Sequence, residues 1–132
     1  MLDFDDANQF LLVHHFAIPT IYTWGDKDRD KRENIRKYVS KGFPDKPLRY
    51  KWYGFRIEVE RSTLRRPLDI ENVPKLVIDA FSDWQISKDK SRYSQLGLYP
   101  DDTFENVRAV YIDGVFSDSD TEKTEVWIFG KK

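Results

Sequence analysis

A short segment that alternates between apolar and polar residues restricts the fold of this chain more than any other feature. Within Lys51–Glu60, every second residue is apolar: Tyr53, Phe55, Ile57 and Val59. Successive side chains of a β-strand point to opposite faces, so this spacing predicts a strand with one apolar and one polar face. The apolar face needs other elements to cover it, which favours a sheet with helices on one side.

Periodicity and β-branched residues predict five further elements. Helical spacing predicts amphipathic helices over Arg29–Lys41 and Val73–Trp84. β-rich segments predict strands over Phe10–Ile18, Val107–Phe116 and Thr124–Phe129. One stripe of the second helix is expected to be buried against the sheet: Leu76, Val77, Ala80, Phe81 and Trp84.

Two polar stretches separate these elements. Ser117–Lys123 lies between the last two predicted strands, and its polarity predicts a hairpin connection between them. Ile86–Tyr99 is rich in serine and lysine and has no period, so we expect a surface loop there. The order β-α-β-α-β-β therefore predicts an α+β fold, α/β-like, in which a mixed sheet is packed by helices on one face.

Composition excludes several classes of protein. The chain has 132 residues, of which 39% are apolar and 15% aromatic, so we expect residues 1–132 to form a single domain around one core. There is no cysteine, which excludes disulfides and cysteine nucleophiles and fits a reducing compartment. No apolar run is long enough to cross a bilayer, and the first residues are acidic. We therefore expect a cytoplasmic protein without a membrane partner.

Charge is unevenly distributed although the net charge is only −1. Ten basic and five acidic residues lie within Asp26–Lys51, whereas acids outnumber bases within Asp101–Glu125. The small net charge argues against a protein that coats nucleic acid through bulk positive charge. The basic segment is either a solvated helix face or, with neighbours such as Tyr38, Tyr50 and Trp52, a surface that meets nucleic acid.

Acidic side chains gather around the start of the second predicted helix. Asp69 and Glu71 are two residues apart in an extended segment, so both carboxylates point to one side, and Lys75 follows in the helix. Asp101 and Asp102 come later, just before a strand. Converging carboxylates without histidine or cysteine are the ligands that Mg²⁺ and Mn²⁺ prefer. Each group also has a structural interpretation, as a helix-start acid or a turn residue.

The spacing of these groups resembles the core signature of the RusA-like Holliday junction resolvases, which are endodeoxyribonucleases. The matched positions are Asp69, Glu71, Asn72, Lys75, Asp79 and Ala80, followed by Asp101 and Asp102. The resemblance implies a RusA-like fold in which Asp69, Glu71 and Asp102 are catalytic carboxylates that bind Mg²⁺, with Mn²⁺ as an alternative ion. It further implies that Asp101 is an additional metal ligand and that catalytic Lys75 contacts the phosphate or the transition state. Asn72 and Asp79 match as supporting residues.

The same resemblance implies a function, which is metal-dependent hydrolysis of Holliday junctions or related branched DNA by a homodimer. The basic residues expected to contact the DNA backbone are Arg61, Arg65, Arg66, Lys31, Arg32 and Arg36. One alternative is a non-catalytic nucleic-acid or protein-binding module whose acidic cluster is structural. Another is a family member that binds branched DNA without cutting it.

Overall fold

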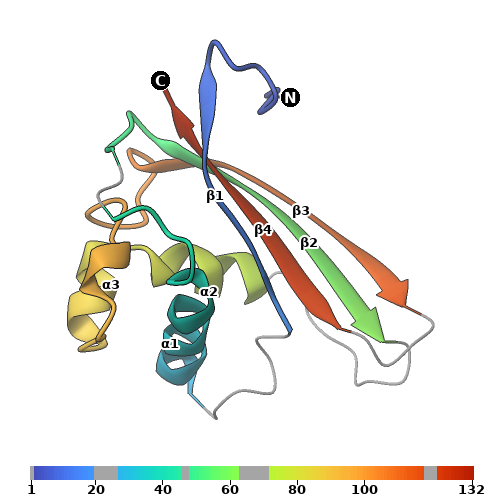
Figure 1. The fold of residues 1–132 in the computed structure, drawn as a ribbon, viewed down its shortest axis with the longest axis vertical. Helices are drawn as coiled ribbons and strands as arrows, with labels where there is room; N and C mark the ends of the chain where they lie inside the picture. Colours follow the sequence, from blue (N-terminus) through green and yellow to red (C-terminus); the bar gives the residue numbers. More distant parts are fainter. Residues whose placement is uncertain (1, 20–26, 46–47, 63–71, 118–121) are drawn as a thin grey trace.

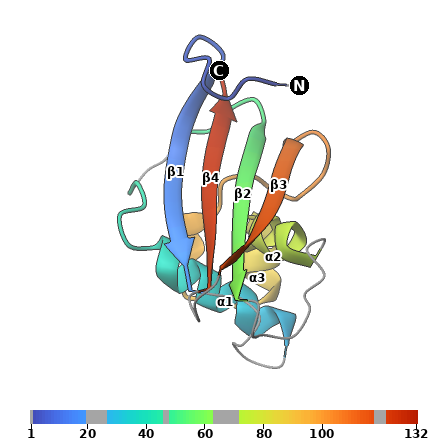
Figure 2. The ribbon, with the colours of Figure 1, turned by 90° about the vertical axis from the view of Figure 1, so that its right-hand side faces the viewer.

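The computed structural model is built on a four-stranded mixed sheet with helices on one of its faces (Figures 1 and 2). It describes residues 2–19, 27–45, 48–62, 72–117 and 122–132. The elements are β1 (Phe10–Ile18), α1 (Asp28–Val39), β2 (Tyr53–Ser62), α2 (Asn72–Ala80), α3 (Asp83–Lys88), the 3-10 turn η1 (Ser94–Leu96), β3 (Val107–Ser117) and β4 (Lys123–Lys131). This is the mixed α+β class that the sequence predicts. None of the described helices is long and apolar enough to span a membrane.

The strand order is β1-β4-β2-β3, which differs from the order predicted for the last two strands. β3 pairs with β2 in parallel, and β4 pairs antiparallel with both β1 and β2. Because β2 lies between β3 and β4, the predicted hairpin pairing of the last two strands is wrong. β4 suits a central position because it is apolar on both sides: Val126 and Ile128 join the main core, and Phe129 joins a cluster on the other face.

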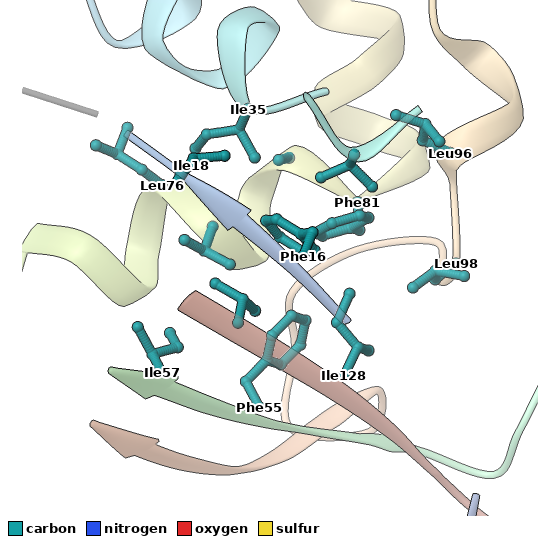
Figure 3. Close-up of a cluster of buried hydrophobic side chains, with 14 of the residues drawn as sticks. Phe16, Ile18, Ile35, Phe55, Ile57, Leu76, Phe81, Leu96, Leu98 and Ile128 are labelled. Atoms are coloured by element: carbon teal, nitrogen blue, oxygen red, sulfur yellow. The ribbon is translucent and has the colours of Figure 1, made fainter. Parts of the chain in front are cut away.

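The main core lies between the sheet and the helices (Figure 3). In β2 the four residues of the alternating pattern are all buried, which confirms the prediction of a strand with one apolar face. The helices contribute Ile35 and Val39 from α1 and Leu76 and Val77 from α2 to the same cluster. Burial of this apolar layer is the main favourable term in folding.

The second predicted helix is shorter than its apolar stripe suggests. α2 ends at Ala80, and Ser82 starts α3, where its hydroxyl accepts a hydrogen bond from the N–H of Gln85 at 3.3 Å. Phe81 is buried as predicted, but Trp84 lies in α3 and is 59% exposed, so its placement in the buried stripe is wrong. A serine cap restarts the helix in a new direction, and apolar spacing alone does not reveal that break.

The segment 86–99 is not the surface loop that its polarity predicts. It completes α3, contains η1 and buries four large side chains: Ile86, Leu96, Leu98 and Tyr99. These side chains are separated by polar residues at irregular intervals, so no local period marks them. Their burial depends on partners that are distant in the sequence.

A smaller cluster lies on the opposite face of the sheet. Phe4 stacks on Phe129 with ring centroids 4.6 Å apart, and Phe10 meets Phe4 edge-on at 5.1 Å. Gly54 permits this approach because a Cβ atom there would lie 2.5 Å from the Phe4 ring. The segment before β1 therefore covers one end of a face that elsewhere exposes polar side chains such as Arg56.

A buried arginine ties the three helices together. The Arg36 guanidinium is fully buried, and its Nε donates a hydrogen bond to the carbonyl oxygen of Ala80 at 2.8 Å. Its two Nη atoms lie 3.1 Å from carboxylate oxygens of Glu33 and Asp89. We expected Arg36 to contact DNA, but its guanidinium is enclosed by these three protein partners and is not available to a phosphate.

We expect Arg36→Met to lower the free energy of unfolding by about 3–5 kcal/mol, because the buried Asp89 carboxylate and the carbonyl of Ala80 lose a partner. Urea denaturation followed by tryptophan fluorescence measures this loss. Lys37→Met, at an exposed position of the same helix, is the matched control and should change stability by less than about 0.5 kcal/mol. Equal denaturation midpoints for the two variants would contradict the role of Arg36.

Candidate active site

Two carboxyl groups from distant parts of the chain meet at the end of α2. Asp79 lies in the last turn of α2, Asp102 lies in the turn before β3, and their carboxyl groups lie close enough to share a hydrogen bond when one of them is protonated. Asp79 is buried, with 8% of its surface exposed, whereas Asp102 is open to solvent. The motif assigned Asp79 a supporting role, and the structure makes it the direct neighbour of Asp102.

Backbone pairing explains why these residues meet. After η1 the chain returns to the start of α3, where the N–H of Leu98 donates to the carbonyl of Phe81 at 2.9 Å. The N–H of Trp84 then donates to the carbonyl of Pro100 at 3.0 Å. This pairing sets Asp102, two residues after Pro100, beside the C-terminal turn of α2.

Asp101 shapes the turn that carries Asp102. Its Oδ1 accepts hydrogen bonds from the hydroxyl of Thr103 at 2.7 Å and from the side-chain amide of Asn106 at 2.9 Å. The hydrogen bonds from Thr103, with a smaller effect from Asn106, lower the pKa of Asp101. Asp101 therefore holds the turn in shape, which agrees with the structural interpretation of this residue as a turn residue.

A pocket of about 270 Å³ opens beside Asp79, between α1 and α2. Its lining contains three cations and two acids: Asp28, Lys31, Arg32, Asn72, Lys75, Leu76 and Asp79. Arg32 is held in place by Asp89, whose two carboxylate oxygens accept hydrogen bonds from Nε and Nη2 at 2.8 and 2.9 Å. The pocket therefore places Lys31, Lys75 and the fixed guanidinium of Arg32 next to the paired carboxyl groups.

The electrostatics of the two carboxyl groups of Asp79 and Asp102 favour a bound cation or a shared proton. Burial and the neighbouring Asp102 raise the pKa of Asp79 to about 6, although Lys75 and Arg32 act in the opposite direction. Burial, and then the charges of the same two acids, also raise the pKa of Tyr99, whose hydroxyl donates to the carbonyl of Ile78 at 2.6 Å. Above pH 6 two negative charges therefore face one another unless a cation lies between them.

The remaining predicted site residues are placed as follows. Asp69, Glu71, Arg65 and Arg66 lie outside the described residues. Arg61 pairs with Glu122 at 3.0 Å, and its side chain is only 15% exposed. Lys31 and Arg32 line the pocket beside Asp79. The structure therefore brings Asp79, Asp102 and Lys75 together with two of the six basic residues.

The donor set of the pair suits a hard divalent cation. Carboxylate oxygens are the ligands that Mg²⁺ and Mn²⁺ prefer, and the carboxyl groups of Asp79 and Asp102 lie beside one another. Within the described residues, no group of three or more histidine, cysteine, aspartate or glutamate side chains could hold a metal ion. Two ligands are thus available in the described part of the chain, and Asp69 and Glu71 are the further candidates.

No protein-family model matches the chain, and no curated protein matches it significantly. The fold and the site therefore define its class by themselves. The chain is a mixed α+β protein with paired carboxyl groups at the edge of a basic pocket.

We expect Asp102→Asn to stabilise the protein at pH 7.5 by on the order of 1 kcal/mol and to have little effect at pH 4.5. The native pKa of Asp79 lies above its unfolded value, so ionisation costs stability as the pH rises through about 6. An amide at position 102 removes the repulsion and can donate a hydrogen bond to Asp79. Urea denaturation at the two pH values measures the difference.

The matched control is Asp113→Asn, since Asp113 is an exposed aspartate of β3. The difference in free energy of unfolding between Asp113→Asn and the wild-type protein should be the same at the two pH values. A stability gain for Asp102→Asn that is equal at both pH values would contradict the assignment of Asp79 as the titrating partner.

Proposed function

We propose that this protein is a Mg²⁺-dependent, structure-selective endodeoxyribonuclease that resolves Holliday junctions or related branched DNA, in the manner of RusA-like resolvases. The observation that carries this proposal is the contact between Asp79 and Asp102 next to Lys75. These three residues belong to two separate parts of the motif, and a chance match in sequence would not require them to converge. A purely structural acidic pair would not require a neighbouring basic pocket either.

The acids and Lys75 would have different roles in hydrolysis of the phosphodiester. Asp102 and its neighbour Asp79 would hold the ion, with Asp69, Glu71 and Asp101 as further ligands by resemblance. A bound Mg²⁺ would activate a water molecule and neutralise charge on the phosphate under attack. Lys75 is exposed and adds a positive charge at the position where negative charge develops.

Basic side chains of α1 would bring the polyanion to the acids. Lys31 and Arg32 line the same pocket as Lys75, Asp28 and Asp79, so a phosphate in the pocket would have three cations beside it as well as two acids. Because Asp89 fixes Arg32 through two hydrogen bonds, little side-chain entropy is lost when a phosphate binds. This arrangement allows an acidic site to accept a negatively charged substrate.

The test uses a synthetic four-way DNA junction and a linear duplex, each incubated with Mg²⁺, Mn²⁺ or EDTA. We expect cutting of the junction that depends on the metal, and little cutting of the duplex. Asp102→Asn should reduce the cutting rate by about 100-fold or more through loss of a ligand, and Lys75→Ala by about 100-fold through loss of transition-state stabilisation. Asp69→Asn tests one of the two proposed metal ligands that lie outside the described residues.

Control variants and binding measurements separate the alternatives. Asp113→Asn should cut like the wild-type protein, because Asp113 lies in β3 and not among the residues that line the pocket. Junction binding without cutting in any metal would indicate a protein that binds branched DNA but does not cleave it. Neither binding nor cutting would indicate an interaction module whose acidic pair is structural.

We also propose that the active form is a homodimer, since two symmetric cuts in a four-way junction require two active sites related by a two-fold axis. β3 is an edge strand on which Val115 and Phe116 are 61% and 77% exposed, and an apolar edge of this kind can pair with another copy. We expect light scattering coupled to size exclusion to give about twice the chain mass of 15.8 kDa. A strictly monomeric species at micromolar concentration would contradict this proposal.

A further inference from the structure

A second basic pocket lies on another face of α1, next to the segment that follows α3. It has a volume of about 460 Å³ and is open to solvent. Its lining consists of four cations, one acid, one amide and one aromatic ring: Arg29, Glu33, Asn34, Lys37, Lys90, Arg92 and Tyr93. The motif that indicates the nuclease site does not include any of these residues.

The cations of this pocket are available to a ligand. Lys37, Lys90 and Arg92 are exposed, and none of them has a carboxylate within 4 Å among the residues that the structure describes. Arg29 has a loose contact with the Asp30 carboxylate at 3.5 Å, its Nε donates a hydrogen bond to the carbonyl oxygen of Asp89 at 2.9 Å, and its side chain is 53% exposed. Four positive charges therefore border one pocket without tight ion pairs.

The one acid of the lining is already satisfied. Oε1 of Glu33 accepts hydrogen bonds from the buried Arg36 and from the hydroxyl of Ser91, and Oε2 accepts one from the backbone N–H of Arg92. Burial would raise the pKa of Glu33, but these hydrogen bonds outweigh it and lower the pKa. Since Arg36 balances the charge of Glu33, the pocket remains positively charged.

Lys90 has an unusual backbone conformation for a lysine. Lys90 follows α3 and has a φ of 52°, in the left-handed region. Its N–H donates a hydrogen bond to the carbonyl oxygen of Ser87 at 3.1 Å. The N–H of Ser91 donates to the carbonyl oxygen of Ile86, also at 3.1 Å. This is the Schellman termination, in which glycine is the usual residue because a Cβ atom disfavours the conformation. A lysine here costs stability, which points to a use for its charged side chain.

We propose that this basic pocket binds backbone phosphates of a DNA arm that extends from the active site. The proposal rests on the proposed nuclease function, which supplies the DNA. α1 lines both pockets, with Arg32 in the first and Lys37 in the second, about 7.5 Å apart along the helix axis. Asp89, which holds Arg32, directly precedes Lys90 in the chain, so the two pockets are neighbours.

The decisive variant is Lys90→Gly, because the proposal predicts opposite effects on stability and on binding. The melting temperature should stay the same or rise, since glycine suits the left-handed conformation. Binding of a fluorescent four-way junction, measured by anisotropy in EDTA, should weaken about eightfold at 0.1 M salt. This value follows from the loss of one phosphate contact, which also lowers the slope of log affinity against log salt by about 0.9.

Two further variants act as controls. Lys90→Arg keeps the charge and should bind DNA like the wild-type protein. Lys123→Ala removes one positive charge at the exposed start of β4, outside both pockets, and should leave the salt dependence unchanged. Inorganic phosphate at millimolar concentration should not displace the DNA, since one phosphate cannot replace contacts to several.

The outcomes separate this inference from the proposed function. If Lys90→Gly binds the junction as tightly as the wild-type protein, or if Lys123→Ala loses as much affinity as Lys90→Gly, the inference is overturned. The cutting assay still tests the nuclease function. If Lys90→Gly weakens binding but the wild-type protein never cuts DNA, the result supports DNA binding by the second pocket and contradicts the nuclease function. If the wild-type protein binds no DNA, the inference is overturned.

Discussion

The buried guanidinium of Arg36 is the interaction on which the arrangement of the helices depends. Its charge lies in the interior, where it costs free energy unless it is paired, and its partners come from α1, α2 and the end of α3. The observed placement of the three helices satisfies all of these hydrogen bonds. Asp89, one of these partners, also binds Arg32, so the same interaction positions Arg32 at the candidate active site.

This constraint links the candidate active site to the second basic pocket. α1 turns Lys31 and Arg32 toward the carboxyl pair and turns Arg29 and Lys37 toward the segment after α3. Both surfaces are positively charged, and both depend on acids that are held in the interior. A chain with a net charge of −1 can therefore present a local cationic surface, since it neutralises some of its own cations and leaves others open.

Much of the fold could be predicted from the sequence, because its strands and helices carry local periods. The strand at 53–62 and the helix at 28–39 lie close to where the patterns place them. The exposure of Trp84 and the burial in segment 86–99 could not be predicted, because both depend on a serine cap and on distant partners. The order of β3 and β4 is decided by which strand needs two covered faces, a property of the whole sheet.

At the candidate site, too, some features could be predicted from the sequence and others could not. The sequence by itself determined which residues are acidic or basic and where regular elements form, because composition and periodicity are local properties of the chain. Only the tertiary contacts show that Asp79 lies beside Asp102, that Arg36 is buried and that Lys37 has no carboxylate partner among the described residues, because charge pairing and burial depend on residues brought together from distant positions. A lysine and an arginine that are neighbours in one helix thus have different environments, since only one of them faces the interior.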